Sequence, residues 1–219
     1  MSRIARVVVT GYPYHITQRG NYKQNTFVEE TDYIRYLMWL EKYRNKYNLS
    51  FLAYCIMPNH VHFIAIPEKD DSLAKTFNTC HMRYSQYFNR KRKVVGHLWQ
   101  GRFYSCALDE QHLYSAIRYV ETNPVRAKLV KNPEDWNWSS AKFHINNQRS
   151  ILSLQGVDEL INIDNWKEYL SQNNDEGTIL KIRSDTLTGR PSGNIMFIQK
   201  FESLLKRQLT SAPIGRPKK

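Results

Sequence analysis

The stretch Leu49–Pro67, LSFLAYCIMPNHVHFIAIP, holds two runs of β-forming residues on either side of a Met-Pro-Asn sequence at positions 57–59. Proline fixes φ and removes a hydrogen-bond donor, and asparagine tolerates turn conformations, so this sequence marks a turn. We therefore predict an antiparallel hairpin, with one strand over Leu49–Ile56 and the next over His60–Ile66.

Segments with strand and helix patterns alternate on both sides of the hairpin. The spacing of apolar residues predicts two further strands and three helices, with Pro124 ending the last helix. The strands are expected over Tyr12–Arg19 and Leu98–Ala107, and the helices over Thr31–Tyr47, Leu73–Arg92 and Asp109–Asn123. The order β-α-β-β-α-β-α is that of a ferredoxin-like split βαβ unit with an extra helix. We predict an α+β fold, with an antiparallel four- to five-stranded sheet and helices on one face.

The composition changes after Val130, where polar segments with short apolar patches replace the regular patterns. Helices are expected over 165–172 and 195–209, with Gly189-Arg190-Pro191 between them. We divide the chain into a domain over residues 1–130 and a mostly helical, partly flexible extension over residues 131–219. The extension is expected to pack loosely, and it ends with a second Gly-Arg-Pro sequence at 215–217.

The net charge of +12 and the isoelectric point near 9.6 suggest a polyanionic partner, with nucleic acid first and an anionic membrane surface second. No apolar run approaches the ~20 residues of a membrane-spanning helix, and the first residues lack the apolar region of a signal peptide. We therefore expect a cytoplasmic protein without a membrane partner. The three cysteines are widely spaced and odd in number, which does not suggest a disulfide framework or a zinc cluster.

His60 and His62 are two residues apart on a predicted strand, so both imidazoles project from one face and could reach one divalent ion. Chance alone places such a pair in about one chain in five, so the spacing by itself is weak evidence. Tyr119 and Asn123 are four residues apart on the third helix, where they share a face and could converge on the same ion. The alternative is that Tyr119 is a core aromatic and Asn123 a helix terminator.

Five segments stand in a characteristic order: YHITQRGN, MPNHVHFIAIP, LWQGRFYS, YSAIRYVETNPVRAKLV and WNWSS. In this order they resemble the REP-associated tyrosine transposases, a branch of the single-tyrosine, IS200-like transposases that carry a His-hydrophobic-His (HUH) motif. The resemblance covers about residues 8–145. It implies that His60 and His62 are metal ligands and that Tyr119 is the nucleophile of a catalytic domain over residues 1–130. It also implies that Asn123 is a third metal ligand, where some relatives carry glutamine.

The resemblance implies a transposase and endonuclease that cleaves single-stranded DNA by transesterification. The Tyr119 oxygen would attack a backbone phosphorus, leaving a 5′-phosphotyrosine and a free 3′-OH, and a second 3′-OH could reverse the link. Imidazole and amide ligands would also suit Zn²⁺, Ni²⁺ or Co²⁺, but the resemblance points to Mg²⁺ or Mn²⁺. The implied partner is a REP-like DNA hairpin in the nucleoid. Relatives include dimers and monomers, and the sequence does not decide between them.

Aromatic and basic side chains outside this motif are candidates for DNA contacts, because aromatics stack on unpaired bases and cations hold phosphates. Trp99 could equally belong to the core, and the cationic run at 90–93 could simply end a solvated helix. The two Gly-Arg-Pro sequences resemble the core of AT-hook peptides that enter the minor groove, or they belong to a disordered basic tail. The DNA-binding candidates are Arg19, Arg90, Lys91, Arg92, Lys93, Trp99, Arg102, Tyr104, Arg190 and Arg216.

Two other functions are alternatives. A ferredoxin-like sheet also serves non-catalytic proteins that bind single-stranded nucleic acid, but the aromatic-glycine signature expected on two central strands is missing. A metal-dependent hydrolase without a covalent step would need a carboxylate beside the ion. Glu121 is the nearest candidate, but it lies about 200° round the helix from Tyr119 and should face away.

Overall fold

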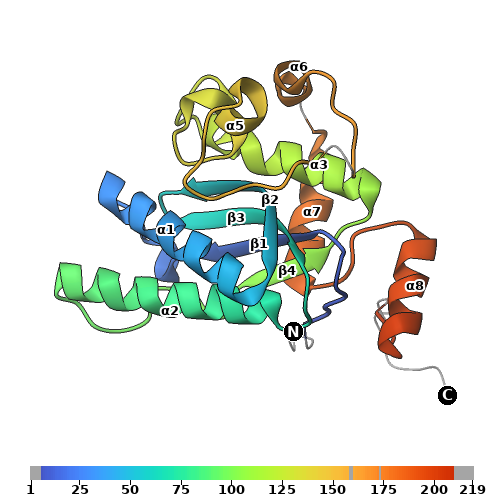
Figure 1. The fold of residues 1–219 in the computed structure, drawn as a ribbon, viewed down its shortest axis with the longest axis horizontal. Coiled ribbons are helices and arrows are strands. Elements are labelled where there is room, and N and C mark those ends of the chain that lie inside the picture. The colour runs from blue at the N-terminus through green and yellow to red at the C-terminus, as the bar shows by residue number, and fades with distance from the viewer. Residues whose placement is uncertain (1–5, 158–159, 173, 210–219) are drawn as a thin grey trace.

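Four antiparallel strands form the sheet in the computed structural model, which describes residues 6–157, 160–172 and 174–209. The strands are β1 (Tyr14–Arg19), β2 (Leu49–Met57), β3 (His60–Pro67) and β4 (Tyr104–Ala107), and their order across the sheet is β2-β3-β1-β4 (Figure 1). β1 and β2 lie on either side of β3, and β3 and β4 lie on either side of β1, which is the split βαβ arrangement. The predicted fold class is therefore confirmed, with four strands.

Helices α1 (Glu30–Tyr47) and α2 (Ser72–Arg92) make the two crossovers and pack against one face of the sheet. Helix α1 begins at a capping box in which Glu29 and Asp32 each bind the other's backbone N–H. Its buried residues recur at three- and four-residue spacing, which is why this segment folds as an amphipathic helix. They pack with Phe51 and Phe63 of the sheet to form the larger of two apolar clusters.

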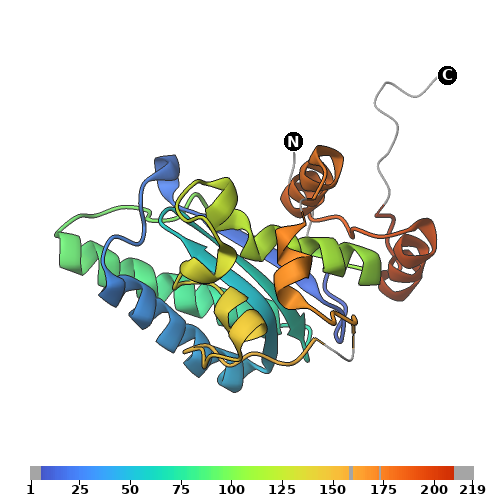
Figure 2. The ribbon, with the colours of Figure 1, turned by 90° about the horizontal axis from the view of Figure 1, so that it is seen from above.

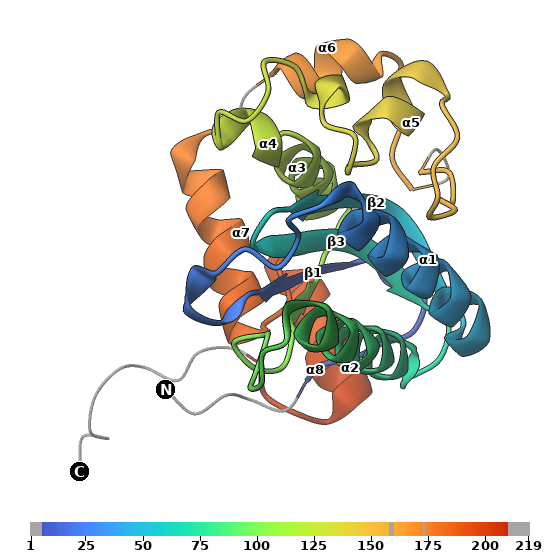
Figure 3. The same cartoon turned by 90° about the vertical axis from the view of Figure 1, so that its left-hand side faces the viewer.

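The opposite face of the sheet is covered by α3 (Glu110–Glu121) and α7 (Glu176–Thr188). Figure 3 shows α7 and α1 on opposite sides of the sheet. The expectation of helices on one face is thus incomplete, because these two helices form a second apolar cluster with the other side of the strands. Cys55, Ile64 and Cys106 belong to that cluster, and His60 and His62 project on the same side.

The remaining helices are short and lie around this core. They are α4 (Asn123–Arg126), α5 (Ala141–Asn146), α6 (Trp166–Ser171) and α8 (Ile195–Leu205), with 3₁₀ turns η1 (Asn21–Lys23) and η2 (Pro133–Asp135). Helix α8 lies at one end of the molecule (Figure 2). Within the described residues, no helix is both long enough and apolar enough to cross a bilayer.

The prediction of a loosely packed extension is wrong for the described residues after position 130. Leu152, Ile182 and Phe201 are fully or almost fully buried, and they join the two apolar clusters of the sheet. The sequence also did not predict α5 and α7. Helix α7 begins at Asp175, whose side chain accepts from the Thr178 N–H, but its apolar residues do not follow a single stripe. A weak stripe is hard to recognise in sequence, because periodicity is the main signal of a surface helix.

Two expected boundaries also differ. Only Tyr104–Ala107 of the predicted strand over 98–107 belongs to the sheet. The preceding segment keeps an isolated antiparallel bridge between Trp99 and Gly20, and Gly101, with φ +154°, interrupts the ladder between that bridge and β4. Pro124 does not end the helical region. It is the second residue of α4, where the missing N–H would have no helical partner in any case.

Candidate active site

The two histidines of the HVH sequence meet on the face of the sheet that α3 covers. His60 is half-buried and His62 is buried, and their ring centroids are 5.0 Å apart with the planes nearly perpendicular. Burial lowers the pKa of His60 to about 3, and the positive charges of Arg19, Arg183 and Arg126 act in the same direction. Burial also lowers the pKa of His62 well below its usual value. Both rings are therefore neutral at pH 7, the form in which imidazole binds metals.

A chain of hydrogen bonds fixes the orientation of His62. Thr186 of α7 donates its hydroxyl to the Ile182 carbonyl at 2.7 Å, so it accepts from His15 Nδ1, also at 2.7 Å. His15 Nε2 is then left with a lone pair, which accepts from His62 Nδ1 at 2.9 Å. This assignment of protons leaves the lone pair of His62 on Nε2. A histidine held in this way through its other nitrogen is oriented as metal-binding histidines are.

His60 is held in a similar way by its neighbour in the sequence. Asn59 Oδ1 lies 2.6 Å from His60 Nδ1, and Asn59 Nδ2 donates to the Lys23 carbonyl at 3.1 Å. The second contact fixes which end of the amide faces His60, so Nδ1 of the ring carries the proton. Nε2 of His60 therefore also carries a lone pair. The two histidines offer the equivalent nitrogen atoms for one ligand.

Tyr119 of α3 packs directly against this pair. Its ring meets the ring of His62 edge-on at 5.4 Å and that of His15 at 5.8 Å, and the side chain is 4% exposed. The Tyr119 hydroxyl accepts from Arg183 Nε at 3.3 Å. Arg126 lies 4.3 Å from the centre of the same ring and donates to the Tyr119 carbonyl at 2.6 Å. Two guanidinium groups thus flank the phenol, and either could offset negative charge on its oxygen.

Tyr114, the other tyrosine of α3, does not belong to this group. Its ring packs against Tyr169 of α6 at 4.5 Å, and its carbonyl accepts from the Tyr169 hydroxyl. The two tyrosines thus have different surroundings, and Tyr119 is the one that contacts a histidine of the HVH sequence.

Asn123 is the first residue of α4, four residues after Tyr119, and its side chain is largely buried. In the part of the chain that the structure describes, the side-chain amide of Asn123 has no hydrogen-bond partner. That part also contains no group of three or more His, Cys, Asp or Glu side chains placed to hold a metal ion. The predicted ligands His60, His62 and Asn123 would be of a different kind, with two imidazole nitrogens and one amide oxygen, and the contacts of the described residues bring together only the two histidines of this set. Donors of these types suit a divalent transition metal.

Glu121, the carboxylate considered for a hydrolase, lies on another side of α3. It is fully buried, accepts from the Ser140 hydroxyl and is 2.7 Å from His144 Nδ1. Ser140 also joins both backbone groups of Tyr54 on β2. Glu121 therefore fastens the end of α3 to β2 and to α5, as the helical angle predicted, and it is not placed to activate a water beside His60 and His62.

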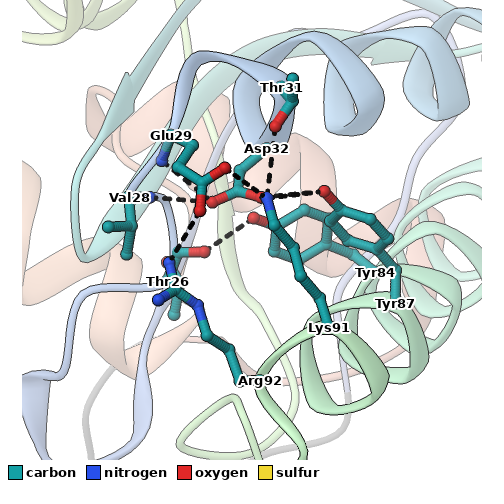
Figure 4. Close-up of polar contacts among 9 residues, drawn as sticks. All are labelled: Thr26, Val28, Glu29, Thr31, Asp32, Tyr84, Tyr87, Lys91 and Arg92. Carbon is teal, nitrogen blue, oxygen red and sulfur yellow. Dashed lines mark hydrogen bonds and ion pairs between the residues drawn. The ribbon is translucent and has the colours of Figure 1, made fainter.

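Two of the four cations at the end of α2, Lys91 and Arg92, join this helix to the start of α1. Lys91 pairs with Asp32 at 2.7 Å and with Glu29 at 3.0 Å, and Arg92 lies 3.5 Å from Glu29 (Figure 4). These two predicted DNA contacts are thus engaged with carboxylates. Lys93 is exposed and ends the helix in a left-handed conformation.

Arg90 lines a surface hollow of about 360 Å³ together with Arg35, Arg83, Trp39 and Tyr87. Lys91 lines the same hollow, but it is paired with Asp32 and Glu29. Within the described residues, the three arginines form no ion pair. Guanidinium groups without a carboxylate partner are suited to phosphate, and that of Arg35 lies over the Tyr87 ring at 4.9 Å.

The prediction that Trp99 stacks on bases is corrected by the structure. Its side chain is 7% exposed, it packs against His81 at 4.9 Å, and its indole N–H donates to the His81 carbonyl. The ring therefore belongs to the aromatic core and offers no free face.

The other DNA-binding candidates lie at the surface, with one outside the described residues. Arg19 is exposed and pairs in register with His60, so it lies beside the histidines. Arg102 is exposed and Tyr104 half-buried, and both line a shallow pocket with Gly189, which precedes half-buried Arg190. Arg216 lies outside the described residues.

Sequence reasoning missed His15, Arg126, Thr186 and Arg183. The first two stand in segments already quoted for the resemblance, where alternation in YHITQR places His15 on the face of the histidine pair. Thr186 and Arg183 stand in a helix that the pattern did not predict. His15 and Thr186 are 171 residues apart in the chain, so no local signal could connect them.

Comparisons with known proteins agree with this geometry. A family model described as "Transposase IS200 like" matches residues 8–123, more than half of the chain. A protein of Escherichia coli (strain K12) named "REP-associated tyrosine transposase" is 24% identical over 121 residues, which cover 54% of this chain and 69% of the relative. A solved structure of a REP-associated tyrosine transposase bound to a REP hairpin superposes with a TM-score of 0.54 and 21% identity. It covers 72% of this chain and 93% of the other, and it supports the fold.

Proposed function

The chain belongs to the family of IS200-like transposases, and we propose that it cleaves and rejoins single-stranded DNA with Tyr119 as the nucleophile. The observation that carries this proposal is the contact between the Tyr119 ring and His62, with Arg183 on the Tyr119 hydroxyl. A nucleophile, two neutral imidazoles and a cation thus share one small region. This arrangement is suited to attack on a phosphodiester, where negative charge develops on oxygen.

The cleavage step forms one bond and breaks another. The oxygen of Tyr119 attacks the phosphorus, and the bond from phosphorus to the 3′ oxygen breaks. The phenol loses its proton, and the departing 3′ oxygen gains one. The DNA is left with a 3′-OH and a 5′ end attached to Tyr119. Attack by another 3′-OH on this phosphotyrosine reverses the step and joins two strands without a nucleotide cofactor.

The arginines beside Tyr119 have a defined role in this reaction. Arg183 and Arg126 offset the charge of the phenolate as it forms, which lowers the free energy of the attacking state. A divalent ion, Mn²⁺ or Mg²⁺, held by His60, His62 and Asn123 would polarise the phosphate oxygens. Because Arg183 stands on α7, we propose that the catalytic unit includes α7 and does not end at residue 130.

We propose that the DNA partner is a hairpin of the REP type, as the name of the E. coli relative and the bound hairpin of the superposed structure suggest. The single strand would pass Arg19 on its way to Tyr119, because Arg19 is exposed beside His60. The other proposed DNA contacts are Arg90, Lys93, Arg102, Tyr104 and Arg190. The proposed compartment is the cytoplasm, at the nucleoid.

The test is cleavage of labelled single-stranded DNA from the flanks of the gene, with Mn²⁺ or Mg²⁺, followed on a denaturing gel. We expect a covalent protein–DNA adduct that requires metal, disappears in Tyr119→Phe and persists in Tyr114→Phe, the matched control on the same helix. DNA that is retarded without an adduct, across several metals and flanks, would favour a non-catalytic binding protein. An adduct that survives Tyr119→Phe would show that another residue is the nucleophile.

A further inference from the structure

The turn that follows β1 has an unusual combination of residues and backbone conformation. Tyr22 has φ 51° and ψ 23°, Lys23 has φ 59°, and the Gln24 N–H donates to the Asn21 carbonyl at 3.0 Å. Two successive positive φ angles closed by this hydrogen bond define a type I′ turn. Glycine and asparagine are strongly preferred at its two central positions. Tyrosine and lysine are disfavoured there, so the chain carries backbone strain at Tyr22 and Lys23.

The Tyr22 side chain contributes nothing to the core that could explain this choice. It is 92% exposed. Within the described residues, it has no hydrogen bond and no ring contact. A large aromatic ring held in solvent on a strained backbone therefore needs a reason outside the folding of this chain. Backbone strain of this kind is concentrated at functional sites, where it fixes a side chain in a required position.

The turn is fastened through Asn59 to the histidine that we propose as a metal ligand. The Gly20 N–H donates to the Asn59 carbonyl at 2.9 Å, and Asn59 Nδ2 donates to the Lys23 carbonyl at 3.1 Å. Asn59 in turn holds His60 through its Oδ1 atom. One asparagine thus joins the turn that carries Tyr22 to the candidate active site.

One further hydrogen bond and a glycine determine where this turn lies. The Asn21 N–H donates to the Leu98 carbonyl at 2.7 Å, which ties the turn to the segment before β4. Gly20 allows the close approach, because a Cβ atom there would lie 2.5 Å from the Gln24 carbonyl oxygen. The position of Tyr22 is therefore set by the backbone, even though nothing holds its ring.

We propose that Tyr22 stacks on an unpaired nucleobase of the DNA strand that enters the active site, and so positions the strand over His60 and Tyr119. Cations precede and follow Tyr22, with exposed Arg19 at the end of β1 and exposed Lys23 in the turn. An aromatic ring between cations is the arrangement that binds single strands, since the ring takes the base and the cations take the phosphates. Every base has an aromatic face, so this contact orients the strand without selecting its sequence. The inference rests on the proposed function.

The test compares three substitutions at this position. Tyr22→Phe keeps the ring and removes the hydroxyl, Tyr22→Ala removes the ring, and Tyr22→Gly removes the ring and suits the positive φ. Met196→Ala, on an exposed part of α8, is the control for loss of a surface apolar group. Each variant is measured for thermal stability, for adduct formation, and for binding of a fluorescent single-stranded oligonucleotide. The binding measurement is made in a Tyr119→Phe background, so that cleavage does not interfere.

We expect Tyr22→Ala and Tyr22→Gly to weaken binding about 5- to 100-fold and to slow adduct formation, while Tyr22→Phe binds as the parent does. Tyr22→Gly should also melt at a higher temperature than the parent, because it relieves the strain at φ 51°. A residue with a purely structural role would give the reverse pattern, with reduced stability and unchanged binding.

Two results would overturn the inference, and they are distinguishable. If the parent forms the adduct and Tyr22→Ala binds and cleaves equally well, then Tyr22 is an exposed side chain without a role, and the proposed function stands. If the parent neither binds the single strand nor forms an adduct, then the proposed function fails and the inference fails with it.

Discussion

His62 is fixed by residues from two distant parts of the chain, and no local pattern connects them. His60, His62 and Tyr119 could be picked out from the sequence because their spacing on a strand and a helix reflects local geometry. His15 and Thr186 could not, because their contacts depend on the packing of α7 across β1 and β4. The same packing brings Arg183 to Tyr119. Sequence reasoning therefore gives the groups proposed to react and misses those that orient them.

The orienting role of His15 predicts a specific defect. His15→Ala removes the acceptor for His62 Nδ1, so the His62 ring loses its fixed orientation. If His62 is a metal ligand, the Mn²⁺ concentration needed for half-maximal adduct formation should rise about 10- to 100-fold. The measurement is a Mn²⁺ titration of the cleavage reaction. His81→Ala is the matched control, since His81 is a buried histidine in the other cluster, between Tyr36 and Trp99. An unchanged titration for His15→Ala would contradict the prediction.

At the scale of elements, the junction between α1 and α2 depends on one buried carboxylate. Burial opposes ionisation of Asp32, but hydrogen bonds from Lys91 and from the N–H groups of Glu29 and Val28 outweigh it and lower the pKa of this carboxyl (Figure 4). A group with a depressed pKa in the folded state stabilises the fold above its unfolded pKa of about 3.9. That contribution is lost as the pH falls through the lower folded value.

Asp32→Asn should therefore destabilise the protein at pH 7 by roughly 2 kcal/mol, since the capping box and the pair with Lys91 are both weakened. The difference from the parent should shrink as the pH falls below about 4. Chemical denaturation of both proteins at pH 7 and pH 3 checks this. Asp71→Asn is the control, because Asp71 forms an exposed pair with Lys75. A constant difference at both pH values would mean that ionisation of Asp32 is not the cause.

The hollow on α1 and α2 makes a second prediction at this scale. If Arg83 and Arg90 hold phosphates, the double variant Arg83→Gln/Arg90→Gln should reduce affinity for single-stranded DNA. The slope of log affinity against log salt concentration should also become shallower, by about 0.7 for each phosphate that the variant no longer binds. The measurement is binding at several salt concentrations. Lys131→Gln/Lys206→Gln removes the same charge from exposed positions elsewhere, and an equal effect of both double variants would indicate only a general charge effect.

The elements themselves were largely predictable, and the exceptions have physical reasons. The strands and helices up to residue 92 follow regular apolar patterns, and their predicted bounds agree with the structure to within one or two residues. The segment over 98–103 is rich in β-forming residues, but it pairs with the end of β1 through an isolated bridge between Trp99 and Gly20, because Gly101, with φ +154°, interrupts the ladder before β4. Helix α7 lacks a clear apolar stripe because the side chains that it contributes to the site, Arg183 and Thr186, are polar.

At the scale of the whole molecule, the extension after residue 130 is integral to the fold. Phe201 of α8 is fully buried and packs on Tyr12 at 4.9 Å. Phe201→Ala should therefore lower the free energy of unfolding by about 3 kcal/mol or more, because it opens a cavity in the core. Leu204→Ala, on the exposed side of the same helix, should change it by about 0.5 kcal/mol or less. Denaturant titration measures both, and equal small effects would support a loosely attached extension.

Because Arg183 stands on α7, it is added to the growing chain after Tyr119 and both histidines. Arg183 follows Tyr119 by 64 residues, so a ribosome working at about 5–20 residues per second adds it roughly 3–13 s later. During that interval the nascent chain holds the tyrosine and both histidines, but it lacks the helix that orients His15 and flanks the phenol. The centre is thus completed only once α7 has been added, and a message cut short before α7 would yield a protein without that helix.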